Sequence, residues 1–203
     1  MTFSMVARCQ KTLTLGVCVS TAVSAVGSRV PHVEAGVGAI ATQAFTNVFY
    51  GTKGLKMLKA GLSPQNALEA MLNEDPGRQS RQVIMIDDEG RTAAFTGKGT
   101  IGWKGHLVGE DYVVAGNMLF SSRVIEAMAH TFENSEEKLA ERLLKALEAG
   151  QEAGGDKRGR MSAALLTANQ QRTVTPRILD LRVDEHHDPV KELRRIFEKK
   201  QRS

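Results

Sequence analysis

The order in which helices and strands are predicted constrains the fold more than any single motif does. The spacing of apolar residues predicts four strands, two helices, three strands, two helices, two strands and a last helix. Helices therefore come in consecutive pairs, which disfavours a doubly wound parallel sheet. The pattern favours an α+β fold in which antiparallel sheets are covered by pairs of helices. We expect one domain over residues 1–203.

The chain opens with a predicted hairpin, residues 2–8 and 13–20. Thr2 becomes the first residue if Met1 is removed, and a small second residue generally permits that removal. A free N-terminal threonine carries a hydroxyl nucleophile and its own base, an α-amine with a pKa of about 8. The alternative explanation is simpler, because β-branched residues are common in strands.

The strand predicted at residues 36–45 consists mainly of small residues, which suit close packing against a neighbour or a ligand. Residues 97–106 are rich in glycine and resemble a mobile lid, in which Trp103 either lines a pocket or packs over the core. Residues 184–188 are dense in potential metal ligands, but neighbours on an extended chain point in opposite directions. We therefore expect no metal site and no cofactor.

The net charge of +4 does not indicate nucleic-acid binding. Residues 190–203 account for all of it, with six basic and two acidic side chains, and Phe197 is their only aromatic residue. Such a segment is most often a solvated helix face.

No apolar run reaches the roughly 20 residues that span a bilayer, and the first ten residues lack the basic start of a signal peptide. We expect a cytoplasmic protein that does not bind membranes. In that compartment Cys9 and Cys18, which flank the first hairpin turn, stay reduced.

Five segments spread over the whole chain carry a family resemblance: residues 1–8, 35–44, 115–119, 154–165 and 180–184. Together they resemble an uncharacterised bacterial and archaeal family within the N-terminal-nucleophile (Ntn) hydrolase superfamily, some members of which have carried a fimbrial assembly label. The resemblance implies a four-layer αββα sandwich, two antiparallel sheets flanked by helix pairs.

The resemblance also implies site residues. Thr2 resembles the superfamily nucleophile, and Asp156 and Ser162 resemble residues that support the terminal amine in proteasome subunits. The segment ending at Thr42 and Gln43 resembles the one whose backbone N–H binds the oxyanion.

Other positions are candidates for the same site. Asn117, at a predicted strand end, is a second candidate oxyanion donor. Ser20 falls where proteasome-like members keep an aspartate. The lysine of those members is missing, and Arg29 and His32 are the nearest polar candidates.

Two functions remain open at this point. The first is hydrolysis of an amide or peptide-like bond in a small-molecule or peptide-like substrate by Thr2. The second is a non-catalytic binding or assembly protein on the same scaffold, including an anion-binding one that uses Arg158 and Arg160. The broad faces of such a scaffold would suit a homodimer.

Overall fold

The computed structural model describes residues 2–169 and 177–202, and it confirms a mixed α+β fold. Its strands are β1 (Thr2–Cys9), β2 (Thr14–Thr21), β3 (Pro31–Glu34), β4 (Gly38–Ala44), β5 (Arg81–Asp87), β6 (Thr92–Thr96), β7 (Trp103–Gly109), β8 (Tyr112–Leu119), β9 (Ser162–Asn169) and β10 (Arg177–Val183). Its α-helices are α1 (Phe49–Lys59), α2 (Pro64–Glu74), α3 (Arg123–Glu133), α4 (Leu139–Glu152) and α5 (Pro189–Gln201).

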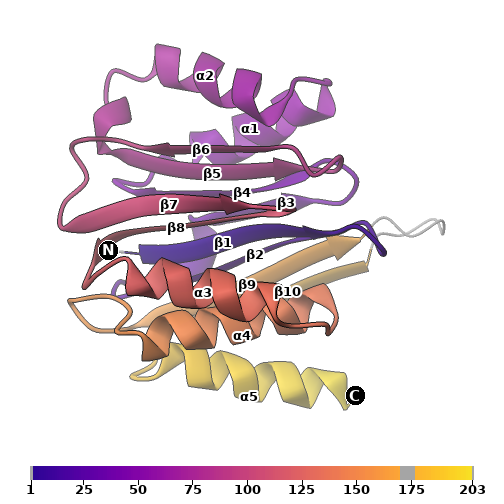
Figure 1. The fold of residues 1–203 in the computed structure, drawn as a ribbon, viewed down its shortest axis with the longest axis vertical. Coiled ribbons are helices and arrows are strands. Elements are labelled where there is room, and N and C mark those ends of the chain that lie inside the picture. The colour runs from indigo at the N-terminus through magenta and orange to yellow at the C-terminus, as the bar shows by residue number, and fades with distance from the viewer. Residues whose placement is uncertain (1, 170–176, 203) are drawn as a thin grey trace.

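The strands form two antiparallel sheets. The six-stranded sheet has the order β10-β9-β2-β1-β8-β7, and the four-stranded sheet has the order β3-β4-β5-β6. Figure 1 shows α1 and α2 beside the four-stranded sheet and α3, α4 and α5 on the other side of the molecule, beside the six-stranded sheet. β1 is therefore a central strand, paired on both edges.

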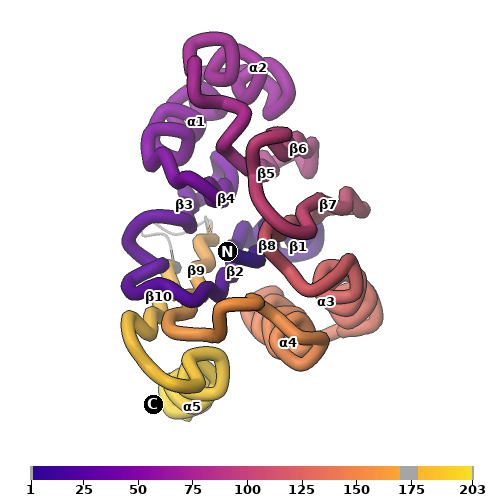
Figure 2. Tube along the Cα trace, turned by 90° about the vertical axis from the view of Figure 1, so that its left-hand side faces the viewer, coloured from indigo at the N-terminus to yellow at the C-terminus, as the bar shows by residue number. Residues whose placement is uncertain are grey.

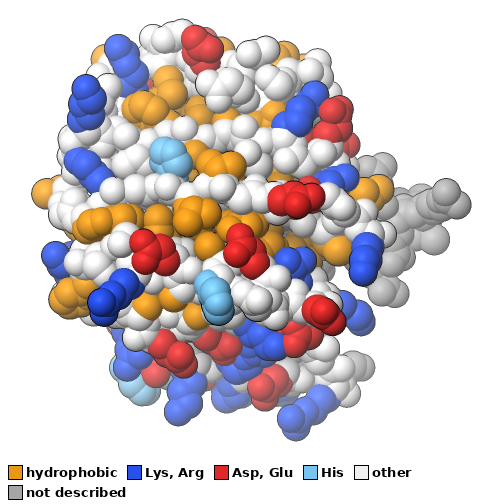
Figure 3. Space-filling view, in the orientation of Figure 1, with side chains coloured by type: hydrophobic (Ala, Val, Ile, Leu, Met, Phe, Trp, Pro, Cys, Tyr) orange, Lys and Arg blue, Asp and Glu red, His pale blue; other side chains and the backbone are white. Residues whose placement is uncertain are grey.

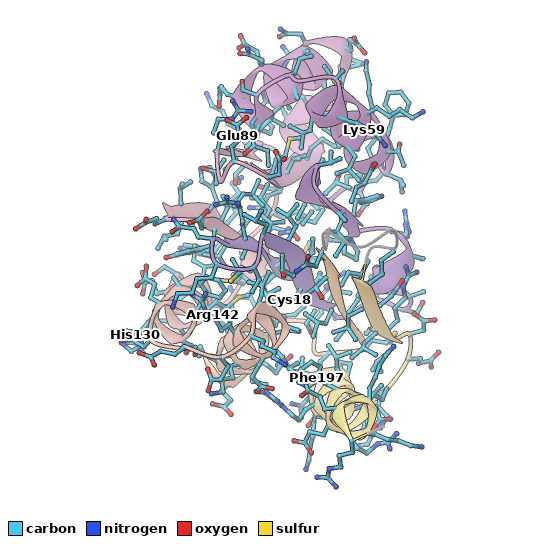
Figure 4. The ribbon with its side chains drawn as sticks, turned by 90° about the vertical axis from the view of Figure 1, so that its right-hand side faces the viewer. Cys18, Lys59, Glu89, His130, Arg142 and Phe197 are labelled. Atoms are coloured by element: carbon cyan, nitrogen blue, oxygen red, sulfur yellow. The ribbon has the colours of Figure 1, made fainter. Side chains whose placement is uncertain are left out.

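Three groups of buried apolar side chains hold these elements together. One joins α1 and α2 to the four-stranded sheet and includes Tyr50 and Met71. The second lies between the two sheets and includes Val6 and Ile84. The third joins the six-stranded sheet to α3, α4 and α5 and includes Cys18, which Figure 4 shows in the interior. Burial of these faces is the main stabilising contribution to the fold.

The glycine-rich segment corrects one prediction. The lid over residues 97–106 is wrong in its second half, because Trp103–Gly109 forms β7, an edge strand paired with β8. Gly105 has a packing reason, because a Cβ on it would lie 3.1 Å from the Trp103 ring. Trp103 packs against the core beside α3, which matches the packing alternative for this residue.

Two arginines of α5 have acidic partners. Arg194 forms ion pairs with Glu141 and Glu148 of α4, and Arg195 pairs with Glu192. In Figure 3, side chains of both signs are mixed over the helices at the bottom of the view. Within the described residues, none of the helices is long and apolar enough to cross a membrane.

Candidate functional site

Thr2 is the first residue of the central strand β1. Its Cα partners are Thr21 of β2 and Asn117 of β8. Side chains alternate along a strand, so Thr2 shares a face with Ser4, whose hydroxyl donates to Gln43 of the other sheet at 2.7 Å. Thr2 therefore faces the space between the sheets. The N-terminal end of the chain, where β1 begins, lies near the middle of the molecule in Figure 2.

The Thr2 side chain is nearly buried, with 7% of the residue exposed. Its Oγ1 lies 3.2 Å from Oγ1 of Thr21, which is within hydrogen-bond distance, and either hydroxyl can donate. The sequence prediction did not single out Thr21, because the residue opposite Thr2 depends on the hairpin register. Ser20 instead pairs with Phe3, and its buried hydroxyl has no hydrogen-bond partner among the described residues.

A pocket of about 230 Å³ adjoins Thr2. Its walls come from the ends of β1 and β2, the segment after β2, the turn after β4 and the loop before β9. It is lined by Thr2, Thr21, Val23, Ser24, Val26, Arg29, Val30, Ala44, Phe45, Thr46 and Arg158. The described lining thus contains two cationic side chains and no acidic one.

Asp156 and Ser162 hold the segment after β2 in place. The Asp156 carboxylate accepts from the N–H of Ala22 at 3.1 Å. Ser162 Oγ donates to the Val23 carbonyl at 2.5 Å and accepts from the Val26 N–H at 3.1 Å. Both residues are buried. They therefore shape one wall of the pocket.

The turn after β4 forms the facing wall. Thr42 is buried, and its hydroxyl donates to the carbonyl of Asn47 at 3.1 Å, which closes the turn. Ala44 takes a left-handed conformation with φ 71°. The Phe45 carbonyl accepts from Nη1 of Arg81 at 2.7 Å, although the residue is 75% exposed. Thr42 thus holds the turn that lines the pocket.

The two arginines of the pocket differ in their partners. The Arg158 side chain pairs with the buried carboxylate of Asp156, with Nη2 3.3 Å from Oδ2. Asp156 also accepts from the Arg158 backbone N–H at 2.8 Å. Arg29 is exposed and has no acidic partner within residues 2–169 and 177–202.

Gln43 and Asn117 lie apart from the pocket lining. Both are buried in a polar network between the sheets. Asn117 Nδ2 and Gln43 Nε2 donate to Oε1 of Gln82 at 2.9 and 2.8 Å. Gln82 in turn donates to the carbonyls of Gly105 and Gly116. The side-chain amides of Gln43 and Asn117 are therefore both hydrogen-bonded within this network.

The remaining candidates also lie outside this pocket. Arg160 pairs with Asp188 at 3.4 Å, so it does not converge with Arg158. His32 packs under α1, where a Cβ on Gly51 would collide with its ring, and burial lowers the pKa of His32. Across the described part of the chain, no group of three or more His, Cys, Asp or Glu is placed to hold a metal ion.

Comparison with known proteins finds a matching family model and a similar solved structure. The model of the Family of unknown function (DUF1028) matches residues 2–193. The crystal structure of protein SPO2555 from Silicibacter pomeroyi, family-model DUF1028, is similar over 98% of this chain and 88% of that chain, with 32% identity and a TM-score of 0.90. Anbu (ancestral beta-subunit) from Yersinia bercovieri is matched over 98% of this chain and 94% of that chain, at 10% identity and with a TM-score of 0.41. No curated protein matches.

Proposed function

The chain belongs to the Family of unknown function (DUF1028), and we propose that it is a hydrolase of an amide or peptide-like bond, with the four-layer αββα architecture of Ntn hydrolases and Thr2 as its nucleophile. The observation that carries the proposal is the place of Thr2. Its hydroxyl lies at the end of a central strand, 3.2 Å from a second hydroxyl, beside a pocket. The chemistry requires Thr2 to carry a free α-amine.

The reaction divides one difficult step into two. The α-amine takes the proton of the Thr2 hydroxyl, and Oγ1 attacks the amide carbon. The tetrahedral intermediate then collapses, its C–N bond breaks, and the leaving amine takes the proton. Water, deprotonated by the same amine, attacks the resulting ester. The bond between the acyl carbon and Oγ1 then breaks, Oγ1 takes the proton back from the amine, and the acid is released. Each turnover consumes one water and leaves Thr2 unchanged.

The developing oxyanion needs N–H donors, and the pocket offers one. Thr46 lines the pocket, and its backbone N–H has no acceptor among the described residues. We assign the oxyanion interaction to this N–H, in the turn that follows Thr42 and Gln43. In other enzymes, one such donor lowers the activation free energy by about 2.7–4 kcal/mol. Asp156 and Ser162 act as positioning residues.

The test begins with the intact mass of untagged protein, which shows whether Thr2 is the first residue. Turnover of a library of N-acylated amino acids and peptides is then measured for the wild type, Thr2→Ala and Thr2→Ser. We expect Thr2→Ala to lose at least about a thousandfold in kcat and Thr2→Ser to retain part of it. The matched control is Thr12→Ala, an exposed threonine in the first hairpin turn. Full turnover by the Thr2→Ala protein would refute the proposal.

A second candidate function is binding without catalysis, including binding of an anion. The observation that favours it is Arg29, an exposed cation lining the pocket with no described acidic partner. This function predicts that Met1 is retained and that Thr2→Ala leaves ligand binding unchanged. Turnover that depends on the Thr2 hydroxyl would contradict it.

A further inference from the structure

We infer that the pocket beside Thr2 selects amides that carry a free carboxylate, held by Arg29, and an apolar side group, held by Val23 and Phe45. N-acylated apolar amino acids are the substrate class with these features. The amide part of the inference rests on the proposed function, whereas the carboxylate site does not.

The charge of the lining indicates a singly charged anion. Arg29 and Arg158 line the pocket, and the Asp156 carboxylate behind it already pairs with Arg158. The balance of these three groups is one positive charge, which resides on Arg29. A planar guanidinium can bind both oxygens of a carboxylate at once, which makes Arg29 the specific anchor.

Part of the rim of the pocket is apolar. Val23 and Phe45 line it and are 47% and 75% exposed. Phe45 is nonetheless held in place, since its carbonyl accepts from Arg81 and the Arg81 guanidinium carbon lies 5.5 Å from the centre of its ring. Val48 and Phe49, which follow the same turn in the chain, are exposed as well. A fixed and exposed aromatic ring suits an apolar ligand group.

The size of the pocket limits the ligand. Its volume of about 230 Å³ is below the roughly 300–1,000 Å³ typical of sites for drug-sized molecules. An amino-acid-sized group fits, with any larger part of the substrate lying along the apolar rim.

The experiment compares matched ligands on the full chain. N-acetyl-L-phenylalanine and N-acetyl-L-phenylalaninamide differ only in the carboxylate, and the leucine and alanine pairs vary the side group. Binding is measured by calorimetry to Thr2→Ala, which lacks the proposed nucleophile, and to Thr2→Ala combined with Arg29→Gln. The control combination carries Arg195→Gln, which changes an exposed arginine of α5.

We expect the acids to bind at least about tenfold more tightly than the amides, and the phenylalanine and leucine ligands to bind more tightly than the alanine ligands. Of the two added changes, Arg29→Gln should remove the preference for the acid and Arg195→Gln should not. Equal binding of acid and amide, no binding of either, or a preference that survives Arg29→Gln would each overturn the inference. Carboxylate-selective binding combined with full turnover by Thr2→Ala would leave the carboxylate site intact and defeat only the proposed function.

Discussion

The hydroxyl oxygens of Thr2 and Thr21 lie 3.2 Å apart, across a pair of residues that face each other on β1 and β2. Two hydroxyls at this distance restrict each other's rotation, because the hydrogen bond requires a particular side-chain torsion. Thr21 is therefore placed to orient the proposed nucleophile without touching the scissile bond itself.

Thr21→Val tests this orientation. The change removes one hydroxyl from a buried site and keeps the branched shape, so we expect kcat to fall about tenfold with little change in KM. Turnover of an N-acylated amino acid, together with thermal unfolding, measures the effect. Thr14→Val, at the other end of β2, serves as the control. A variant with normal kcat would show that Thr21 has no orienting role.

Ser162→Ala tests the wall after β2. The change leaves the Val23 carbonyl and the Val26 N–H without their buried partner, so we expect a loss of about 1–3 kcal/mol in the free energy of unfolding. Urea denaturation measures this loss, and hydrogen exchange at Val26 should accelerate. Ser28→Ala, an exposed hydroxyl of the same loop, should have little effect. Unaltered exchange at Val26 would contradict the support role of Ser162.

Part of this site could be predicted from the chain alone. The element order, with its helix pairs, led to the α+β fold, and two antiparallel sheets follow from that order. The structure brings Thr2, Arg29 and Arg158 to one pocket and places Asp156 and Ser162 behind its wall. Resemblance to a family supplied these positions except Arg158, which was predicted as an anion contact from its own segment. No local pattern links residues so far apart in sequence.

Other parts depended on tertiary structure. The segment ending at Gln43 was predicted to supply a backbone N–H and Asn117 a second donor. Polar residues at strand ends give no indication that both side-chain amides meet Gln82, Gln43 from the neighbouring strand and Asn117 from the other sheet. Strand β7 was missed because Gly105, which makes room for Trp103, resembles a loop glycine in a sequence. Thr46 gave no signal, since an unpaired backbone N–H is a property of the turn and not of the residue type.

Gln82→Leu tests the polar network between the sheets. The Gln82 side chain joins Gln43 and Asn117 to two backbone carbonyls and is fully buried. Its loss leaves several polar groups unsatisfied at once, each of which costs about 1–3 kcal/mol. We therefore expect the free energy of unfolding to fall by about 3 kcal/mol or more, which is the order of the cost of two such groups.

Chemical denaturation of Gln82→Leu measures that decrease. Gln65→Leu on the exposed face of α2 is the matched control and should stay within about 0.5 kcal/mol of the wild type. A Gln82→Leu protein as stable as this control would show that the network contributes nothing net to stability.

Asp75→Asn tests the pH dependence of the wall that carries Phe45. Asp75 accepts from Arg81 at 2.8 Å, from the Gly77 N–H at 2.8 Å and from the Tyr50 hydroxyl at 3.0 Å. The hydrogen bond from Arg81 lowers the pKa of Asp75, although burial opposes the shift. A carboxyl whose pKa is lowered by folding contributes stability above its ordinary pKa of about 4 and loses that contribution as pH falls through the folded-state value.

Asp75→Asn should therefore be less stable than the wild type at pH 6, with a difference that shrinks steadily below about pH 4. Urea denaturation at pH 6, 4 and 3 measures this difference, and Asp88→Asn in the exposed turn after β5 is the control. Arg81 also donates to the Phe45 carbonyl, so weakening its pair with Asp75 should loosen the apolar rim and raise KM for apolar substrates. A stability difference that is constant from pH 6 to pH 3 would show that the charge of Asp75 does not stabilise this wall.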